Sequence, residues 1–153
     1  MKHIGYSFPA EKIISEVSIE DKKRVFSICD PRDSSTYIYN EEKDYFNGYK
    51  ESWFGYTQKK GGWDCLRHYE ILSNGCLPFF KGVDNIPPEI MVFFPKYECR
   101  EILYIGKQHL VGLNIKDKEN QLIDLSNLLL KYTKRKLCCT AMAKYLLSEM
   151  KNA

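Results

Sequence analysis

The fold is decided by residues 61–80, which run GGWDCLRHYEILSNGCLPFF. Two glycines open the stretch as a flexible turn, and apolar residues then recur at helical spacing, which predicts a helix over residues 65–74 with Asp64 as its N-terminal cap. Gly75 ends that helix. The run 76–80 is short, apolar and aromatic, so it predicts a strand directly after the helix.

The segments on the N-terminal side extend this alternation of strands and helices. Residues 25–29 form an apolar run that predicts a buried strand, and residues 53–57 form an aromatic run that predicts a second one. Between them, aromatic residues at helical spacing predict a helix over residues 41–51, with Asn40 as its cap. Strands that alternate with helices favour a parallel sheet, so the predicted fold is a Rossmann-like three-layer α/β domain.

The C-terminal half is predicted to be mainly helical. Residues 90–94 are a candidate fourth strand, and Pro95 opens a helix that runs to about residue 104. Residues 121–150 predict two helices that meet near residues 139–140, with Thr140 as the cap of the second.

Length and composition are those of a folded protein. The 153 residues fit one domain, here residues 1–153, and the 44% hydrophobic and 28% charged residues exclude a disordered or low-complexity chain. No apolar run approaches the ~20 residues of a membrane helix, so we expect no membrane span. The first ten residues lack the apolar core of an export signal, which favours a cytoplasmic location.

The cysteines, histidines and basic residues carry no motif of their own. None of the six cysteines belongs to a C-x-x-C pair, so we expect free thiols. Because His3, His68 and His109 are scattered along the chain, we expect no metal site, and a packed or surface role for His68. The net charge of +3 is modest and is spread over short clusters, which argues against nucleic-acid binding.

The helix predicted over residues 65–74 carries the candidate binding site. The turn at Gly61 and Gly62 leads into a helix N-terminus, where backbone N–H groups and the helix dipole suit a phosphate. Arg67 adds a cation near that end, and Glu70 lies one turn further on the same face, where its carboxylate suits the vicinal hydroxyls of a ribose. The alternative is an ordinary surface ion pair between Arg67 and Glu70, worth ~0.3 kcal/mol.

The same stretch resembles a known signature. Arg67, Glu70, Gly75 and Pro78 fit the frame R-x-x-E-x-x-x-x-G-x-x-P. This frame is similar to the nucleotide-sugar-binding signature of the C-terminal half of GT-B glycosyltransferases, most closely the exostosin-like ones. The likeness covers about residues 20–150, but only the central twenty are specific.

The resemblance implies a donor-binding domain whose ligand is a nucleotide-diphosphate sugar, with no cofactor. It implies that Glu70 binds the ribose, that Arg67 contacts the diphosphate, and that Gly75 and Pro78 shape the turn beneath the sugar. Beside these, the backbone of Gly61 and Gly62 is expected on the diphosphate, and Asp64 either caps the helix or contacts the ligand. Aromatic stacking on a base or sugar is expected from one of three residues, namely Trp53, Tyr56 or Trp63.

Two departures from the family pattern limit what the resemblance implies. The position eight residues before Glu70 is Gly62, so the E-x7-E arrangement of many retaining enzymes is absent and the stereochemical outcome stays open. Complete GT-B enzymes also have two Rossmann-like domains, and 153 residues provide only one. We therefore expect the acceptor-binding domain on another polypeptide, or a chain that binds donor without efficient transfer.

Two other classes of function compete with this hypothesis. A non-catalytic interaction module would dock on a partner through the apolar faces of residues 128–130 and 141–147, and it predicts exposed apolar helix surface without nucleotide binding. A nucleic-acid-binding protein would need the basic residues of 131–136 to join Lys59 and Lys60 on one face.

Overall fold

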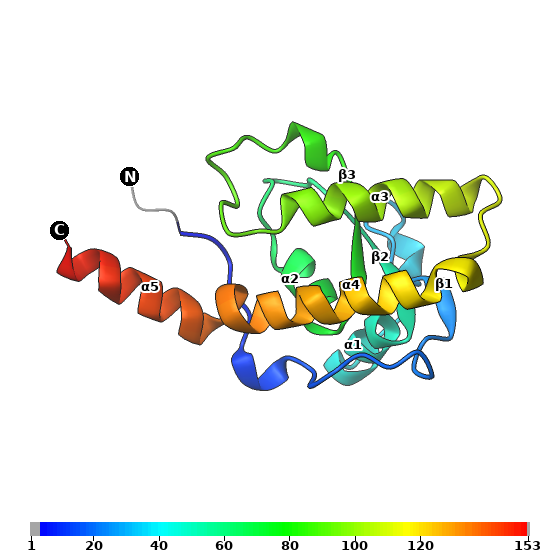
Figure 1. Cartoon of the computed structure of the whole chain (residues 1–153), viewed down its shortest axis with the longest axis horizontal. Coiled ribbons are helices and arrows are strands. Elements are labelled where there is room, and N and C mark those ends of the chain that lie inside the picture. The colour runs from blue at the N-terminus through cyan, green and yellow to red at the C-terminus, as the bar shows by residue number, and fades with distance from the viewer. Residues whose placement is uncertain (1–3, 153) are drawn as a thin grey trace.

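In the computed structural model, which describes residues 4–152, three strands form one parallel sheet (Figure 1). The strands are β1 (Arg24–Phe26), β2 (Ser52–Gln58) and β3 (Leu77–Lys81), and β2 lies in the centre. Helix α1 (Glu42–Lys50) connects β1 to β2, and helix α2 (Leu66–Ser73) connects β2 to β3. The predicted α/β fold with a parallel sheet is confirmed.

Helices cover both faces of this sheet. Successive side chains of each strand point to opposite faces, so both faces carry apolar side chains that need a covering helix. On one face, a Cβ placed at Gly55 would lie 2.9 Å from the Ile71 side chain, so α2 packs directly on β2. On the other face, Phe79 lies against Gly106 of α3 (Lys96–Leu110), where a Cβ would come within 2.6 Å of the phenyl ring. The glycines let helix and sheet approach closely, and the result is a helix–sheet–helix arrangement.

The C-terminal part is helical, as expected, but it is divided differently. A short 3-10 turn (Ile115–Lys118) precedes α4 (Glu119–Tyr132), which continues through a π-helical turn (Thr133–Leu137) and is followed by α5 (Cys139–Lys151). Figure 1 shows α5 extending away from the body of the domain. Among the described residues of α5 only Met142 is buried, whereas Leu147 and Met150 are 58% and 71% exposed.

The predicted fourth strand at residues 90–94 is wrong. This segment consists of turns, in which the Phe94 N–H donates to the Met91 carbonyl and Met91 has a φ of 52°. Met91 and Phe94 are both buried, and Tyr132 of α4 donates a hydrogen bond to the Phe93 carbonyl. The apolar side chains therefore reach the core from a turn, and β3 remains an edge strand, the position that tolerates Pro78.

Several predicted helix ends are also corrected. The side chains of Asn40 and Asp64 do not cap α1 and α2, whose N-cap residues Glu41 and Cys65 make no capping hydrogen bond. Thr140 lies within the first turn of α5, not at its cap. The two C-terminal helices meet at the extended residue Cys138, close to the predicted residues 139–140, whereas α3 continues to Leu110, beyond residue 104.

The first strand is shorter than predicted, and this matters for the site. It ends at Phe26, and Ser27 and Cys29 already belong to the loop that follows. The Ser27 hydroxyl donates to the Cys29 carbonyl and accepts the Tyr56 N–H of the neighbouring strand. A hydrogen bond to the Ser27 side chain thus takes the place of a backbone hydrogen bond between the two strands. From there the loop turns away at the carboxyl end of the sheet.

Candidate functional site

A cavity of about 280 Å³ lies where β1 and β2 end. Gln58 is the last residue of β2, Pro31 lies in the loop after β1, and Cys65 lies at the start of α2. Ligands of parallel α/β sheets bind outside the carboxyl ends of the strands, so this cavity is the candidate site. It is lined by Pro31, Thr57, Gln58, Lys60, Cys65, Arg67 and Glu70.

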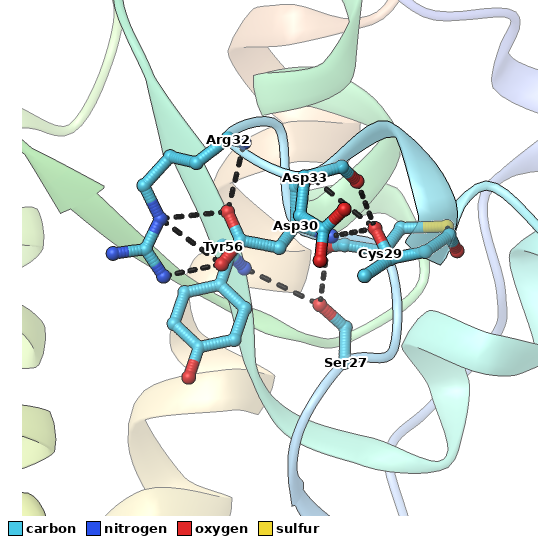
Figure 2. A network of polar contacts seen from close by, with 7 residues as sticks. Ser27, Cys29, Asp30, Arg32, Asp33 and Tyr56 are labelled. Atoms are coloured by element: carbon cyan, nitrogen blue, oxygen red, sulfur yellow. Dashed lines mark hydrogen bonds and ion pairs between the residues drawn. The ribbon is translucent and has the colours of Figure 1, made fainter.

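The loop after β1 forms one wall of the cavity and is fixed by its own polar side chains (Figure 2). The Asp30 carboxylate accepts a hydrogen bond from the Arg32 Nε at 2.8 Å, and the Asp30 N–H donates to Thr36 Oγ1 at 2.9 Å. Asp33 accepts the Ser35 N–H at 2.9 Å and so caps the short 3-10 turn that follows. The loop therefore holds a defined shape without regular secondary structure.

Two of the three aromatic residues expected to stack on a base or sugar are occupied by protein contacts. Trp53 is only 3% exposed and lies beneath the Lys22 ammonium group. The Tyr56 ring stacks on Phe26 at 4.7 Å between centroids, and the Arg32 guanidinium lies 5.1 Å from its centroid. Trp63 is half-buried with Lys59 over its ring, and it does not line the cavity.

Arg67 lies in the cavity wall with its guanidinium 5.1 Å from the centroid of the Tyr37 ring. Within residues 4–152 it makes no ion pair with an acidic side chain, and in particular none with Glu70. Burial by itself lowers the pKa of Arg67, but the surrounding tyrosine hydroxyl groups outweigh this effect and raise the pKa above its ordinary value. A permanently charged guanidinium thus lines the cavity without an ion pair to any described residue.

Glu70 lines the same cavity and is held by a chain of hydroxyl groups from α1. Its Oε2 accepts a hydrogen bond from the Tyr45 hydroxyl at 2.8 Å, which in turn lies 3.0 Å from the Tyr49 hydroxyl. Burial raises the pKa of Glu70, and the Tyr45 hydrogen bond and the Arg67 charge oppose that shift. Tyr45 thus fixes the carboxylate through Oε2, while Oε1 accepts no hydrogen bond from the described residues and is left for a ligand.

Of the packed and surface roles expected for His68, the structure shows the packed one, and the ring fixes the turn before α2. The ring is fully buried, with Nδ1 2.8 Å from Thr57 Oγ1 and Nε2 2.8 Å from the Trp63 carbonyl oxygen. Since a carbonyl only accepts, Nε2 carries the hydrogen and Nδ1 accepts from Thr57. Burial lowers the pKa of His68 to about 4, so the ring is neutral at pH 7 and joins the end of β2 to the start of α2.

The remaining predicted site residues before α2 lie beside the cavity without lining it. Gly61 and Gly62 are exposed, and a Cβ on Gly61 would meet no atom within 4 Å. Trp63 contributes its carbonyl to His68. Asp64 is used for structure, because its two carboxylate oxygens accept the Tyr6 N–H at 3.0 Å and the Tyr69 hydroxyl at 2.8 Å.

Gly75 and Pro78 lie at the other end of α2. Gly75 follows the helix with a φ of +63° and packs against Val17, and Pro78 is a buried residue of β3 that pairs with Gly55. Neither residue lines the cavity, although Pro78 pairs with Gly55, two residues before the cavity-lining Thr57. The structure therefore brings two of the four signature residues into one cavity and uses the other two to build the fold.

The other residues around the cavity could hardly be found from the sequence. Tyr37 and Tyr45 are distant from Arg67 and Glu70 in the chain, and the spacing of Tyr45 indicated only a shared helical face. Lys60 was visible as one of a basic pair, but nothing in the sequence separates its position from that of Lys59. Only the packing of α1 and the loop after β1 against α2 shows which side chains meet.

A second, larger cavity of about 700 Å³ lies between the π-helical turn and α5. Its apolar wall includes Phe93 and Tyr145, whose rings pack edge to face at 4.9 Å between centroids. Its basic side chains are Lys134, Arg135, Lys136 and Lys144. Lys59 does not line this cavity and Lys60 lines the first one, so the two basic clusters do not share one binding site.

No family model, no curated protein and no solved structure matches this chain. Within residues 4–152, no group of three or more His, Cys, Asp or Glu side chains is arranged to hold a metal ion, and His3 lies outside the described residues. The six cysteines carry free thiols. In the same part of the chain no helix is long and apolar enough to cross a membrane.

Proposed function

We propose that the chain is the donor-binding domain of a glycosyltransferase and that it holds a nucleotide-diphosphate sugar in the 280 Å³ cavity. One observation carries this proposal. Arg67 and Glu70, the two signature residues expected to touch the donor, line the same cavity at the carboxyl ends of the strands and are not paired with each other.

The geometry favours distinct roles for the two residues. Arg67 is charged and has no acidic partner in residues 4–152, so it is suited to the diphosphate. Glu70 is held by Tyr45 through Oε2, so its Oε1 is suited to accept a hydrogen bond from a ribose hydroxyl. Small-molecule sites usually measure about 300–1,000 Å³, so we expect the nucleotide to fill the cavity and the sugar to lie outside it.

The proposed donor-binding domain is one of the two domains that a complete glycosyltransferase of this type needs. The cavity is lined by residues of β2, α2 and the connecting loops of one domain, so acceptor contacts and the exclusion of water would come from a second domain, on this or another polypeptide. A reducing cytoplasm is the proposed location, supported by the six free thiols.

The test is a calorimetric titration of the purified chain with a panel of nucleoside diphosphates, their sugar conjugates and the matching nucleosides. We expect at least one nucleoside diphosphate and its sugar conjugate to bind with one-to-one stoichiometry, and the bare nucleoside to bind more weakly. Failure of every member of the panel to bind would overturn the proposal.

A second candidate function is the non-catalytic interaction module. The specific observation in its favour is the 700 Å³ cavity beside α5, together with the exposed Leu147 and Met150 on a helix that extends from the body. It predicts concentration-dependent self-association in light scattering, reduced by the double change Leu147→Ser and Met150→Ser, and no nucleotide binding.

A further inference from the structure

Two cations of the candidate site lie over one aromatic ring. The Lys60 Nζ is 5.9 Å and the Arg67 Cζ 5.1 Å from the centroid of Tyr37, and both cations line the 280 Å³ cavity. Aromatic faces attract cations within about 6 Å of their centroid. The Tyr37 ring thus contacts two positively charged side chains that line one cavity.

One acidic side chain, Glu70, lines the same cavity, and the Arg67 charge opposes the rise in its pKa, but no ion pair joins Glu70 to either cation within residues 4–152. Neither Lys60 nor Arg67 makes an ion pair there, although six other ion pairs are present in that part of the chain. Like charges that approach each other repel, so their gathering beside a cavity favours an anionic ligand. Lys59 provides the contrast, since its ammonium group lies over Trp63 at 4.9 Å and outside the cavity lining.

Tyr37 owes its position to the fixed loop after β1. Asp33 caps the 3-10 turn Ser34–Thr36, and the Tyr37 N–H donates to the Ser34 carbonyl at 3.2 Å. Thr36 is hydrogen-bonded to both arms of the loop, because its hydroxyl oxygen lies 2.9 Å from the Asp30 nitrogen and 2.7 Å from the Asp33 carbonyl oxygen. The ring is therefore carried by a defined segment, although 42% of the residue is exposed.

We propose that Tyr37 is a positioning residue that holds Lys60 and Arg67 together as a two-cation subsite for a diphosphate, and that Lys60 contacts the ligand directly. The identity of the ligand rests on the proposed function, but the subsite itself is recognised by charge alone. A diphosphate carries two to three negative charges near neutral pH, and two adjacent cations match it better than they match a single phosphate.

The experiment is a calorimetric titration with inorganic pyrophosphate, orthophosphate and the nucleoside diphosphate that binds best. Lys60→Met is compared with Lys59→Met, which removes the neighbouring charge outside the cavity. Tyr37→Leu is compared with Tyr37→Phe, which keeps the aromatic face. Circular dichroism and urea unfolding establish that each variant is folded.

We expect Lys60→Met to lose about tenfold in pyrophosphate affinity, equivalent to about 1.4 kcal/mol, and Lys59→Met to stay within about twofold of the wild type. Tyr37→Leu should lose about threefold to tenfold, and Tyr37→Phe should retain most of the affinity. Orthophosphate should bind more weakly and respond less to either change.

Each outcome decides one point. A wild-type chain that does not bind pyrophosphate, or equal losses in Lys60→Met and Lys59→Met, would overturn the subsite. Equal affinities of Tyr37→Leu and Tyr37→Phe would remove Tyr37 as the positioning residue. Pyrophosphate binding with the expected pattern but no nucleotide-sugar binding would leave the subsite standing and reject the donor-binding function.

Discussion

At the scale of single residues, the candidate site depends on which side chain each functional group meets. Glu70 and Arg67 lie one turn apart on α2, and that spacing is equally typical of an ion pair and of a ligand site. The structure separates them through tyrosines, because Tyr45 holds the carboxylate and Tyr37 lies beneath the guanidinium. The guanidinium and the carboxylate therefore both line the cavity and form no ion pair with each other.

The first prediction concerns Glu70. Glu70→Gln keeps the side-chain shape and an oxygen for Tyr45, but it removes the charge that strengthens a hydrogen bond from the ligand, so nucleotide affinity should fall by ~1.5–3 kcal/mol. Glu101→Gln, on the exposed side of α3, is the matched control and should leave affinity unchanged. Calorimetry measures both, and equal binding by wild type and Glu70→Gln would exclude a role for this carboxylate.

The second prediction concerns His68 and pH. The folded-state pKa of about 4 lies below the unfolded value of 6.5, so the unfolded chain takes up the proton first and stability is lost as pH falls from 6.5 towards 4. Between pH 7 and pH 5 this histidine should cost about 2 kcal/mol of unfolding free energy. Urea unfolding at both pH values measures the loss, and His68→Gln should show a correspondingly smaller pH dependence. An identical pH dependence in the two proteins would contradict the assignment.

At the scale of the elements, the ends of helices and strands are joined by a few buried polar contacts. The Lys22 ammonium group is the clearest case, since it donates to the carbonyl oxygens of Lys50, Ser52 and Gly75 at 2.8–3.0 Å. These three carbonyls belong to the end of α1, the start of β2 and the turn after α2. One side chain thus connects the amino-terminal side of the sheet, opposite the cavity.

The third prediction tests this connection. Burial lowers the pKa of Lys22 to about 8, so the group is still mainly charged at pH 7 and its bonds are charge-assisted. Lys22→Met should lower the unfolding free energy by about 2 kcal/mol. Lys23→Met, which loses only an exposed ion pair to Glu51, should cost at most about 0.5 kcal/mol. Similar decreases in unfolding free energy in the two variants would show that the buried hydrogen bonds of Lys22 stabilise the fold no more than an exposed ion pair does.

The fourth prediction separates the two readings of Gly75, as a turn beneath the sugar or as a helix terminator. Its φ of +63° disfavours any side chain, and a Cβ would lie 2.4 Å from the Val17 side chain. Gly75→Ala should therefore destabilise the fold by about 1–3 kcal/mol while the folded protein keeps its nucleotide affinity. Gly61→Ala is the control for stability, because a Cβ at this position would meet no atom within 4 Å. A large loss of affinity in folded Gly75→Ala would place this residue at the ligand.

At the scale of the whole molecule, the two cavities lie in different parts of the domain. One is built at the carboxyl ends of the strands, and the other lies beside α5, the helix that extends from the body (Figure 1). A domain that binds donor at one place and presents a basic, partly apolar surface at another suits a protein that works with a partner domain.

The fifth prediction follows from that arrangement. The purified chain should bind a nucleotide-sugar yet transfer the sugar poorly or not at all, because no second domain closes over the donor and orients an acceptor. Product analysis by mass spectrometry, with soluble sugars and peptides as acceptors, measures transfer and donor hydrolysis together. Efficient transfer by the chain alone to a defined acceptor would show that it is not half of an enzyme.

The class of fold and the helix that carries the candidate site could be predicted from the sequence. Apolar runs 25–29, 53–57 and 76–80 alternate with helical periodicity, and that pattern indicates a parallel α/β sheet because parallel strands need a crossover connection, usually a helix. The same pattern placed Arg67 and Glu70 on one face of one helix. Turn 90–94 was misassigned because a short apolar run fits a strand and a buried turn equally well.

Packing between elements sets which groups those two side chains contact. Tyr37 and Tyr45 come from other segments of the chain, and Gly75 and Pro78 lie in the turn after α2 and in β3, outside the cavity lining. The physical reason is that burial, cation–π contact and hydrogen bonding depend on distances between segments far apart in the chain. Periodicity fixes the face of an element, and packing between elements fixes its partners.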